Sequence, residues 1–128
     1  MAHILLIEPD VVLAANYQQA LEHAGQSVSV VHGAQAAIMA ADQQLPDVIV
    51  LELQLSNHSG VEFLYEFRSY PEWQNIPVVV QTFIPEREFA SSKSLLKNEL
   101  GVVAYLYKPR TSLQKLVQTV SALTTVTA

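Results

Sequence analysis

The sequence predicts an α/β domain built on a single doubly wound, five-stranded parallel sheet with five helices. Short apolar runs alternate with longer segments whose apolar residues recur at helical spacing. The run Val-Ile-Val-Leu at residues 48–51 is apolar at every position, which is typical of a strand covered by helices on both faces. Half of the 128 residues are hydrophobic, enough for one core. We therefore expect one domain at 1–124 and a tail or linker stub at 125–128.

The element boundaries follow from local start and stop signals. The predicted strands are residues 4–7, 28–31, 48–51, 76–80 (running on to 81–82) and 102–107. The predicted helices are residues 11–23, 33–43, 60–69, 85–101 and 112–123. Asp10 is a candidate N-cap for the first helix and Gly25 a stop signal after it. Pro71 ends the third helix, and Thr111 or Ser112 caps the last one.

Helical spacing also predicts which side chains are buried. In the third helix it places Val61, Leu64, Tyr65 and Arg68 on one face. In the last helix it places Leu113 inward with Leu116. Trp73 follows the third helix, and we expect its ring to cover that helix rather than to stack on a ligand.

Composition excludes several function classes. Seven basic against twelve acidic residues give a net charge of −5, which argues against non-specific nucleic-acid binding. The absence of cysteine excludes a disulfide framework and thiol chemistry, and makes a reducing cytoplasm the simplest location. The four histidines show no metal-ligand spacing. No apolar run is long enough for a signal peptide or a membrane span.

Polar residues stand where four of the predicted strands end. These residues are Glu8, Glu52, Thr82 and Lys108. Each alone has an ordinary explanation, such as a loop acid, a β-forming threonine or a surface lysine. Because parallel strands end at one edge of the sheet, all four are expected in one crevice there. Their coincidence favours a functional site, with Lys108 in salt-bridge reach of Glu52 and Glu8 close by.

The motifs around these strand ends resemble those of the response-regulator receiver domain. They are Ile4 to Asp10, Pro46 to Leu53, Ile76 to Thr82 and Tyr105 to Pro109, and the resemblance extends from about Ile4 to Leu123. It implies a flavodoxin-like, CheY-like fold with strand order 2-1-3-4-5. It also implies a role in two-component phosphorelay signalling rather than an enzymatic one.

The resemblance also implies a role for each position of the site. The acidic pair that holds Mg²⁺ in the family corresponds to Glu8 and Pro9, and the phosphoacceptor corresponds to Glu52. The phosphate-binding pair corresponds to Thr82 and Lys108. The aromatic residue that changes rotamer on activation corresponds to Tyr105, and the peptide bond before Pro109 is expected to be cis.

The sequence departs from the family pattern at several positions. The acceptor is Glu52 instead of Asp, and Pro9 replaces one acid of the metal-binding pair. Phe83 stands where the family has a small residue, and Ser56 where it has a proline. The segment between Thr82 and Lys108 looks about one helical turn longer than usual.

The first two departures bear on phosphoryl chemistry. Pro9 removes a carboxylate from the magnesium site, leaving Glu8 and Glu52 as weak candidate ligands. Glu52 carries its carboxylate about 1.5 Å further into the crevice than Asp would, and in-line transfer depends on positioning. We therefore expect a phosphorylation-independent module without a bound cofactor. Glu52 then either imitates the phosphorylated acid or only plugs the site.

Two alternatives remain open. One is a working phosphoacceptor receiver of a phosphorelay that uses Glu52. The other is a small flavodoxin-like enzyme or cofactor carrier, which is disfavoured because no glycine-rich phosphate loop follows the first strand.

A receiver domain that is not phosphorylated, which we call a pseudo-receiver, would have to act by binding another protein through its surface. In the family that surface comprises the fourth helix, fifth strand and fifth helix, and we expect a homodimer or a protein partner there, without nucleic-acid or membrane contact. Phe83, Phe89 and Tyr105 supply large side chains to this face. The alternative is that these aromatic residues close the domain's own core.

Overall fold

The computed structural model describes residues 2–56 and 58–124, so the predicted tail at 125–128 lies outside the described residues. The strands are β1 (His3–Ile7), β2 (Ser27–Val31), β3 (Val48–Leu51), β4 (Gln54–Leu55), β5 (His58–Ser59), β6 (Val78–Thr82) and β7 (Val102–Tyr107). The α-helices are α1 (Val11–His23), α2 (Ala34–Gln43), α3 (Gly60–Arg68) and α4 (Leu113–Thr124). Shorter or irregular helices are η1 (Pro71–Trp73), η2 (Glu86–Ser92), η3 (Leu95–Glu99) and η4 (Lys108–Arg110).

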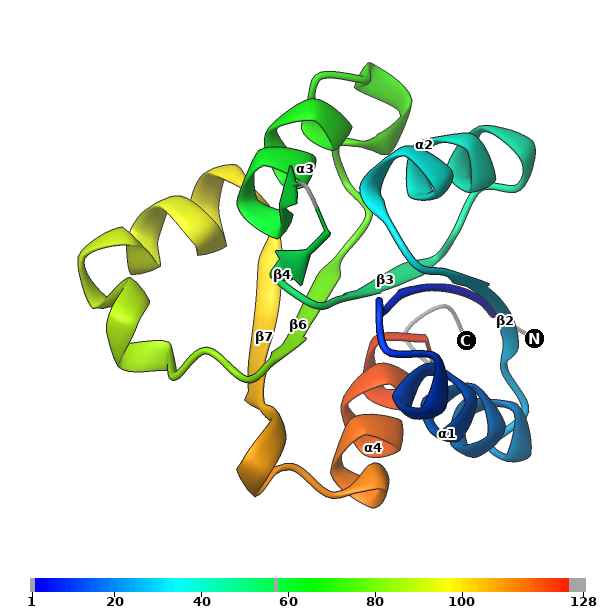
Figure 1. The fold of residues 1–128 in the computed structure, drawn as a ribbon. Coiled ribbons are helices and arrows are strands. Elements are labelled where there is room, and N and C mark those ends of the chain that lie inside the picture. The colour runs from blue at the N-terminus through cyan, green and yellow to red at the C-terminus, as the bar shows by residue number, and fades with distance from the viewer. Residues whose placement is uncertain (1, 57, 125–128) are drawn as a thin grey trace.

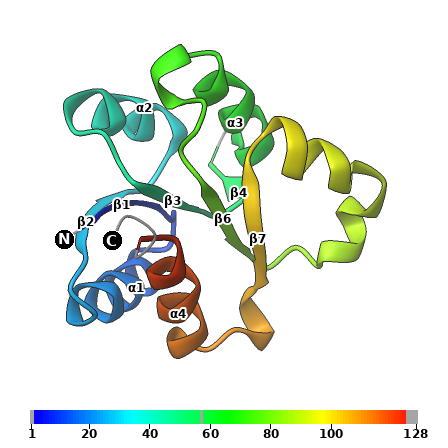
Figure 2. The ribbon, with the colours of Figure 1, turned by 180° about the vertical axis from the view of Figure 1, so that it is seen from behind.

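Five strands form one parallel sheet in the order β2-β1-β3-β6-β7. Strands β4 and β5 form a separate two-stranded hairpin, so β6 and β7 are the fourth and fifth strands of the sheet. The predicted order 2-1-3-4-5 is therefore confirmed. Helices α2 and α3 cover one face of the sheet, and α1 and α4 cover the other (Figure 1). The view from behind shows the same layers, with β7 at the sheet edge opposite β2 (Figure 2). Among the described residues, no helix is both long and apolar enough to cross a membrane.

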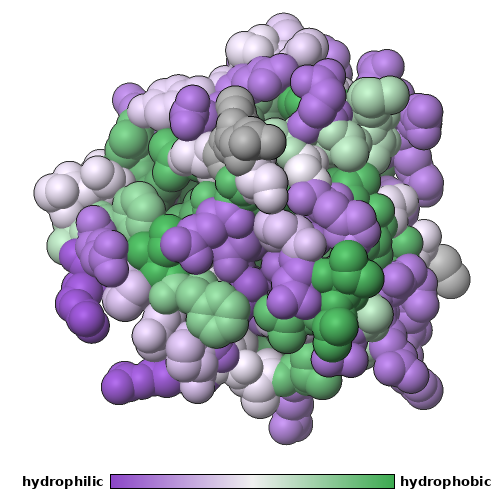
Figure 3. All heavy atoms as spheres, in the orientation of Figure 1, coloured by the Kyte–Doolittle hydropathy of each residue, from purple (hydrophilic) through white to green (hydrophobic). Residues whose placement is uncertain are grey.

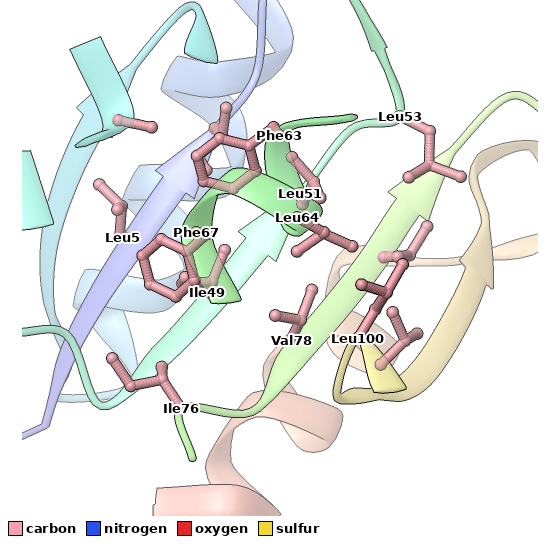
Figure 4. Close-up of a cluster of buried hydrophobic side chains, with 14 of the residues drawn as sticks. Leu5, Ile49, Leu51, Leu53, Phe63, Leu64, Phe67, Ile76, Val78 and Leu100 are labelled. Carbon is pink, nitrogen blue, oxygen red and sulfur yellow. The ribbon is translucent and has the colours of Figure 1, made fainter. Parts of the chain in front are cut away.

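Each face of the sheet carries its own core. Under α2 and α3, Phe63 and Phe67 pack on Ile49 and Leu51 of the central strand (Figure 4). Trp73 is buried and stacks on Phe67 with ring centroids 4.8 Å apart, so it covers α3 as predicted. On the other face, a second cluster joins the sheet to α1 and α4.

Capping groups explain where the helices begin and end. The Asp10 carboxylate accepts hydrogen bonds from the backbone N–H groups of Val12 and Leu13, which confirms it as the N-cap of α1. The Ser59 hydroxyl and Glu62 carboxylate form a reciprocal capping box at α3. Ser112 accepts from the Lys115 N–H and so, of the two candidates, is the residue that caps α4.

Leu113, which was predicted to point inward, and Tyr65, which was predicted to share a face with Leu64, both lie on the surface. Tyr65 is 52% exposed and Leu113 45% exposed. In α3 the buried stripe contains Phe63, Leu64 and Phe67, which leaves Tyr65, with its polar hydroxyl group, on the solvent side.

The predicted helix at 85–101 is the largest error in the secondary-structure prediction. The segment instead forms the 3₁₀ helix η2, which leaves helical geometry at Phe89, and the π-helix η3. No residue of η2 is fully buried and only Phe89 is packed against the core, so core packing gives an α-helix little stabilisation there. In η3 the Leu100 N–H bonds to the Leu95 carbonyl five residues earlier, and Leu96 and Leu100 both reach the core.

The β4–β5 hairpin was not predicted, and it requires Gly60. The Gly60 N–H donates to the Leu53 carbonyl at 2.8 Å. A Cβ atom at this position would lie 2.6 Å from the Leu53 Cα. A residue without a side chain therefore lets α3 start directly against the chain that leaves the central strand.

His3 gives the fold a predicted dependence on pH. Its ring is buried, with Nδ1 3.2 Å from Ser27 Oγ and Nε2 3.1 Å from Ser29 Oγ. Burial lowers the pKa of His3 below its usual value and outweighs the opposite effect of Asp47. The unfolded chain therefore binds this proton at a higher pH than the folded chain does, so stability falls as the pH drops below about 6.5.

We expect the free energy of unfolding to decrease more steeply on acidification in the wild type than in His3→Gln. Urea denaturation at several pH values between about 7.5 and 5.5 measures both slopes. Since the other titrating groups are common to both proteins, equal slopes would show that His3 does not cause the dependence.

Candidate functional site

The sheet brings the four predicted site residues together at its carboxyl edge. Glu8 follows β1 and Glu52 follows β3, and these strands are neighbours in the sheet. Thr82 is the last residue of β6, and Lys108 comes directly after β7. Strands β6 and β7 are also neighbours in the sheet. All four side chains are buried, although each carries a charge or a hydroxyl group. Buried charges need partners, so their contacts define the site.

Lys108 bridges the two carboxylates. Its Nζ atom lies 2.7 Å from Glu52 Oε1 and 2.7 Å from Glu8 Oε1. The predicted salt bridge is therefore present, and Glu8 is a full partner in it. Two carboxylates and one ammonium give the cluster a net charge of −1.

The remaining carboxylate oxygens also have donors. Glu52 Oε2 accepts hydrogen bonds from the Thr82 hydroxyl and from the Gln54 N–H, the latter at 3.0 Å. Glu8 Oε2 accepts from the Asp10 N–H at 3.1 Å. Every carboxylate oxygen in the cluster thus has a partner within the chain, which offsets the cost of burial.

The charge state of Lys108 is set by these bonds. Burial alone would lower the pKa of Lys108, but hydrogen bonds and charge attraction from Glu52 and Glu8 outweigh it and raise the pKa above its usual value. Lys108 is therefore an ammonium at neutral pH and a permanent counter-ion for the two glutamates.

Aromatic side chains lie beside this cluster. The Phe83 ring centroid is 4.7 Å from Lys108 Nζ, so the ring lies against the ammonium on the exposed side. Tyr105 points into the fold, donates its hydroxyl proton to the Ile84 carbonyl at 2.7 Å and packs against Phe89. Burial raises the pKa of Tyr105 to about 12, with smaller contributions from nearby glutamates.

The expected cis bond before Pro109 is not present. The described chain has no cis peptide bond, so the Lys108–Pro109 bond is trans. Lys108 reaches both glutamates with this backbone geometry.

The residues present do not fit Mg²⁺. The ammonium of Lys108 already lies between the two carboxylates, so a cation bound by the same two oxygens would have to displace it. Pro9 offers no side-chain ligand, and the neighbouring Asp10 carboxylate caps α1. Among the described residues, no group of three histidine, cysteine or acidic side chains could hold a metal ion.

Sequence reasoning missed three parts of the site. These are the bond from the Gln54 N–H to Glu52, the bond from the Asp10 N–H to Glu8, and the position of the Phe83 ring against Lys108. The first two depend on loop backbone geometry, which has no signature in the sequence. The aromatic residue directly after Thr82 was the one available signal for the third.

Comparison with known proteins identifies the family. The family model of the response regulator receiver domain matches residues 4–121. The chain belongs to this family. It is therefore a receiver domain of two-component signalling, with the CheY-like fold that the motifs implied.

Relatives and solved structures agree with this assignment. The KDP operon transcriptional regulatory protein KdpE of Escherichia coli K12 is 28% identical over 109 residues, which are 85% of this chain and 45% of KdpE. The chain thus spans less than half the length of this relative. The structure of Vibrio cholerae chemotaxis protein CheY4 has a TM-score of 0.84 at 21% identity, covering 96% of this chain and 98% of that one. The Mn²⁺-bound response regulator Rcp1 has a TM-score of 0.76 at 27% identity, covering 100% and 97%.

Proposed function

We propose that this receiver domain signals by protein–protein contact without being phosphorylated, and that it is not an enzyme. The observation that carries the proposal is that the Glu52 carboxylate accepts hydrogen bonds from both Lys108 and Thr82. In the family these two positions bind the phosphoryl oxygens. Here a carboxylate of the chain itself already engages both groups.

The surroundings of Glu52 support the same proposal. Both of its oxygens accept hydrogen bonds, one of them from an ammonium, which lowers their nucleophilicity toward a phosphoryl donor. The lysine ammonium takes the place of a metal ion between the acids. The Phe83 ring lies over Lys108 and places an apolar group beside the cluster. In-line phosphoryl transfer needs a positioned nucleophile and charge neutralisation at the transferred group.

The same contacts favour a role for Glu52 as an internal substitute for the phosphorylated acid. A side chain that only blocked the site would need no specific bonds. Glu52 instead bonds to both groups that would otherwise hold the phosphoryl oxygens. Its single charge is less than that of a phosphoryl group. We propose that this constant occupation holds Thr82, and with it the start of the segment that leads to η2, in one fixed state.

Incubation with acetyl phosphate and Mg²⁺ tests the proposal. We expect the intact mass of the protein to stay unchanged, because Glu52 is bonded and the metal site lacks an acid. A receiver domain with the usual aspartate serves as the positive control under the same conditions. A stoichiometric phosphate adduct on Glu52 would instead establish the alternative, a functional phosphoacceptor.

The surface for a partner is proposed on η2, η3, β7 and α4, the counterparts of the predicted fourth helix, fifth strand and fifth helix. Phe83 and Val103 are more than half exposed there, whereas Phe89 and Tyr105 are only partly buried against the core. The exposed apolar groups at the sheet edge support a protein contact, either with a partner or with a second copy. KdpE is named a transcriptional regulatory protein, but we propose no nucleic-acid contact by this domain.

A further inference from the structure

The part of the chain around the edge strand β2 is almost free of charge. Residues 11–43, which comprise α1, β2 and α2, contain only the acids Glu22 and Asp42 and no lysine or arginine, although the chain has seven basic and twelve acidic residues. Three apolar side chains of the two helices are more than half exposed, namely Val11, Val12 and Met39. Strongly hydrophobic side chains show at the lower right of Figure 3, over the start of α1 in Figure 1. Because depletion of charge distinguishes interface cores from other surface, this composition is typical of a protein contact.

Strand β2 presents an open edge between α1 and α2. The two helices contact it from opposite faces of the sheet, and among the described strands it pairs only with β1 (Figure 1). The Ser27 N–H and the Val31 carbonyl both bond toward the β1 side. Since the direction of the backbone groups alternates along a strand, the N–H and carbonyl groups of Val28 and Val30 point to the open side. All five residues of β2 are only partly buried, so this side is accessible.

Strand β2 has none of the usual protections of a sheet edge. Natural sheets protect their edges with charged side chains, proline or a bulge. The sequence of β2 is Ser-Val-Ser-Val-Val, and it pairs with β1 in unbroken register. The opposite edge strand β7 is different, because its pairing with β6 shifts register between Val78 and Val79 and passes over Val103. The uncharged and regular edge of β2 is therefore a template for a further strand.

We propose that a second copy of this domain occupies this edge, with the two β2 strands antiparallel about a two-fold axis at Ser29. In this register Val28 of one protomer lies opposite Val30 of its partner, and their outward N–H and carbonyl groups form hydrogen bonds. Val28 and Val30 both pack toward the cluster under α1, so apolar side chains meet on that face of the joined sheet. Ser29 points to the other face and meets its own counterpart there. The strand is thus complementary to itself on both faces.

The surroundings of the edge select a second copy as the occupant. A standard interface takes about 20–30 residues from each partner, so the five residues of β2 need the neighbouring surfaces of α1 and α2 as well. The two-fold axis places α1 beside α1 and α2 beside α2, and each helix carries a single acid. A highly charged partner would find no opposite charge to pair with there. This contact lies at the opposite edge of the sheet from the partner surface proposed above and leaves that surface free.

Single cysteines test the register, because the chain has no cysteine of its own. In the proposed pairing the two Ser29 residues form a non-hydrogen-bonded pair, with Cα atoms about 4.5 Å apart, within the range of a disulfide. Ser29→Cys should therefore give a disulfide-linked dimer under mild oxidation, visible on a non-reducing gel.

Ser27→Cys is the matched control for this cross-link. Both serines bond to the His3 ring, so each variant loses one such bond. Ser27 lies opposite Val31 of the other protomer, which leaves the two residues at position 27 about 13 Å apart. This variant should stay monomeric on the gel. Failure of Ser29→Cys to link, or equal linking of both variants, would overturn the proposal.

Sedimentation equilibrium measures the association without a cross-link. We expect a reversible dimer in the wild type and at least about tenfold weaker association in Ser29→Lys, which sets two ammonium groups against each other at the axis. Ser29→Ala loses the same bond to His3 without adding a charge, and should associate within about twofold of the wild type. The N–H groups of Val28 and Val30 should gain protection from hydrogen exchange as the protein concentration rises.

Other results separate this inference from the proposed function. A strict monomer would overturn the β2 contact. A dimer that survives Ser29→Lys and leaves the N–H groups of Val28 and Val30 unprotected would place the association elsewhere and also overturn it. Neither result bears on the phosphorylation test. A phosphate adduct on Glu52 would overturn the proposed function and leave the β2 contact standing.

Discussion

Replacing Lys108 by methionine should lower the free energy of unfolding by about 3–5 kcal/mol at neutral pH. The ammonium is the shared counter-ion of Glu8 and Glu52, and all three groups are buried. Without it, two like charges face each other in a site that water scarcely reaches. Methionine keeps most of the side-chain volume, so the loss reports the charge rather than a cavity. Chemical denaturation of the variant and the wild type measures it.

Two comparisons isolate the charge effect. The triple variant Glu8→Gln/Glu52→Gln/Lys108→Met removes the unpaired charges and should recover much of the lost stability. Lys115→Met, at an exposed position of α4, should change stability by less than about 0.5 kcal/mol. If Lys108→Met lowered the free energy of unfolding as little as Lys115→Met does, the charges of Glu8, Glu52 and Lys108 would have to be solvated and independent.

The pH dependence of the same variants gives a second signature. In the wild type the raised pKa of Lys108 means that its stabilising contribution is complete below the unfolded value of 10.5 and is lost as the pH rises through the higher folded value. In Lys108→Met, proton uptake by one carboxylate relieves the repulsion. The deficit of the variant should therefore shrink as the pH falls from about 7 toward 5.

Replacing Arg68 by leucine should cost about 3 kcal/mol of stability. The guanidinium donates to the carbonyls of Leu100, Trp73 and Ile76, at 3.0, 2.6 and 2.6 Å respectively. It thereby ties the end of α3 to the loop before β6 and to the turn before β7. Leucine preserves the apolar stem but leaves three partly buried acceptors without this donor, and thermal or urea unfolding measures the loss.

The planar fork of Arg68 is what the site requires. Arg68→Lys should recover only part of the loss, because an ammonium cannot reach three carbonyls in three directions. The exposed Arg110→Leu should be close to neutral, and a similar small effect for Arg68→Leu would show that the three bonds contribute nothing net. Gly101 must stay small beside the guanidinium, since its φ is +71° and a Cβ there would lie 2.1 Å from Arg68 Nη2.

Local sequence signals predicted the regular elements well. Helix α1 begins and ends where the Asp10 cap and Gly25 predicted, and strand β3 matches the apolar run at 48–51. Both succeed because their determinants, a capping carboxylate, a glycine with φ of +92° and a fully apolar strand, act within a few residues. The parallel topology follows from the alternation of strands and helices, so the convergence of the four strand-end residues was also predictable.

The segment between Thr82 and Lys108 could not be predicted in the same way. Its residues suit a helix, but in η2 only Phe89 packs against the core and no residue is fully buried, and the π-turn at η3 depends on how Leu96 and Leu100 reach the sheet. The exposure of Tyr65 has a similar origin, since Phe63 and Phe67 occupy the buried face of α3. Such competition between apolar residues is decided by tertiary packing.

The sequence by itself determined the receiver fold and the identity of the residues at its carboxyl edge, because strand order and strand ends are encoded locally. Only the tertiary structure decided that Lys108 bonds equally to Glu8 and Glu52, that Thr82 and the Gln54 N–H satisfy the remaining oxygen of Glu52, and that Phe83 lies against the ammonium. These contacts join residues up to 100 positions apart in the chain. Their distances depend on rotamers and loop backbone that form only once the sheet has assembled and excluded water.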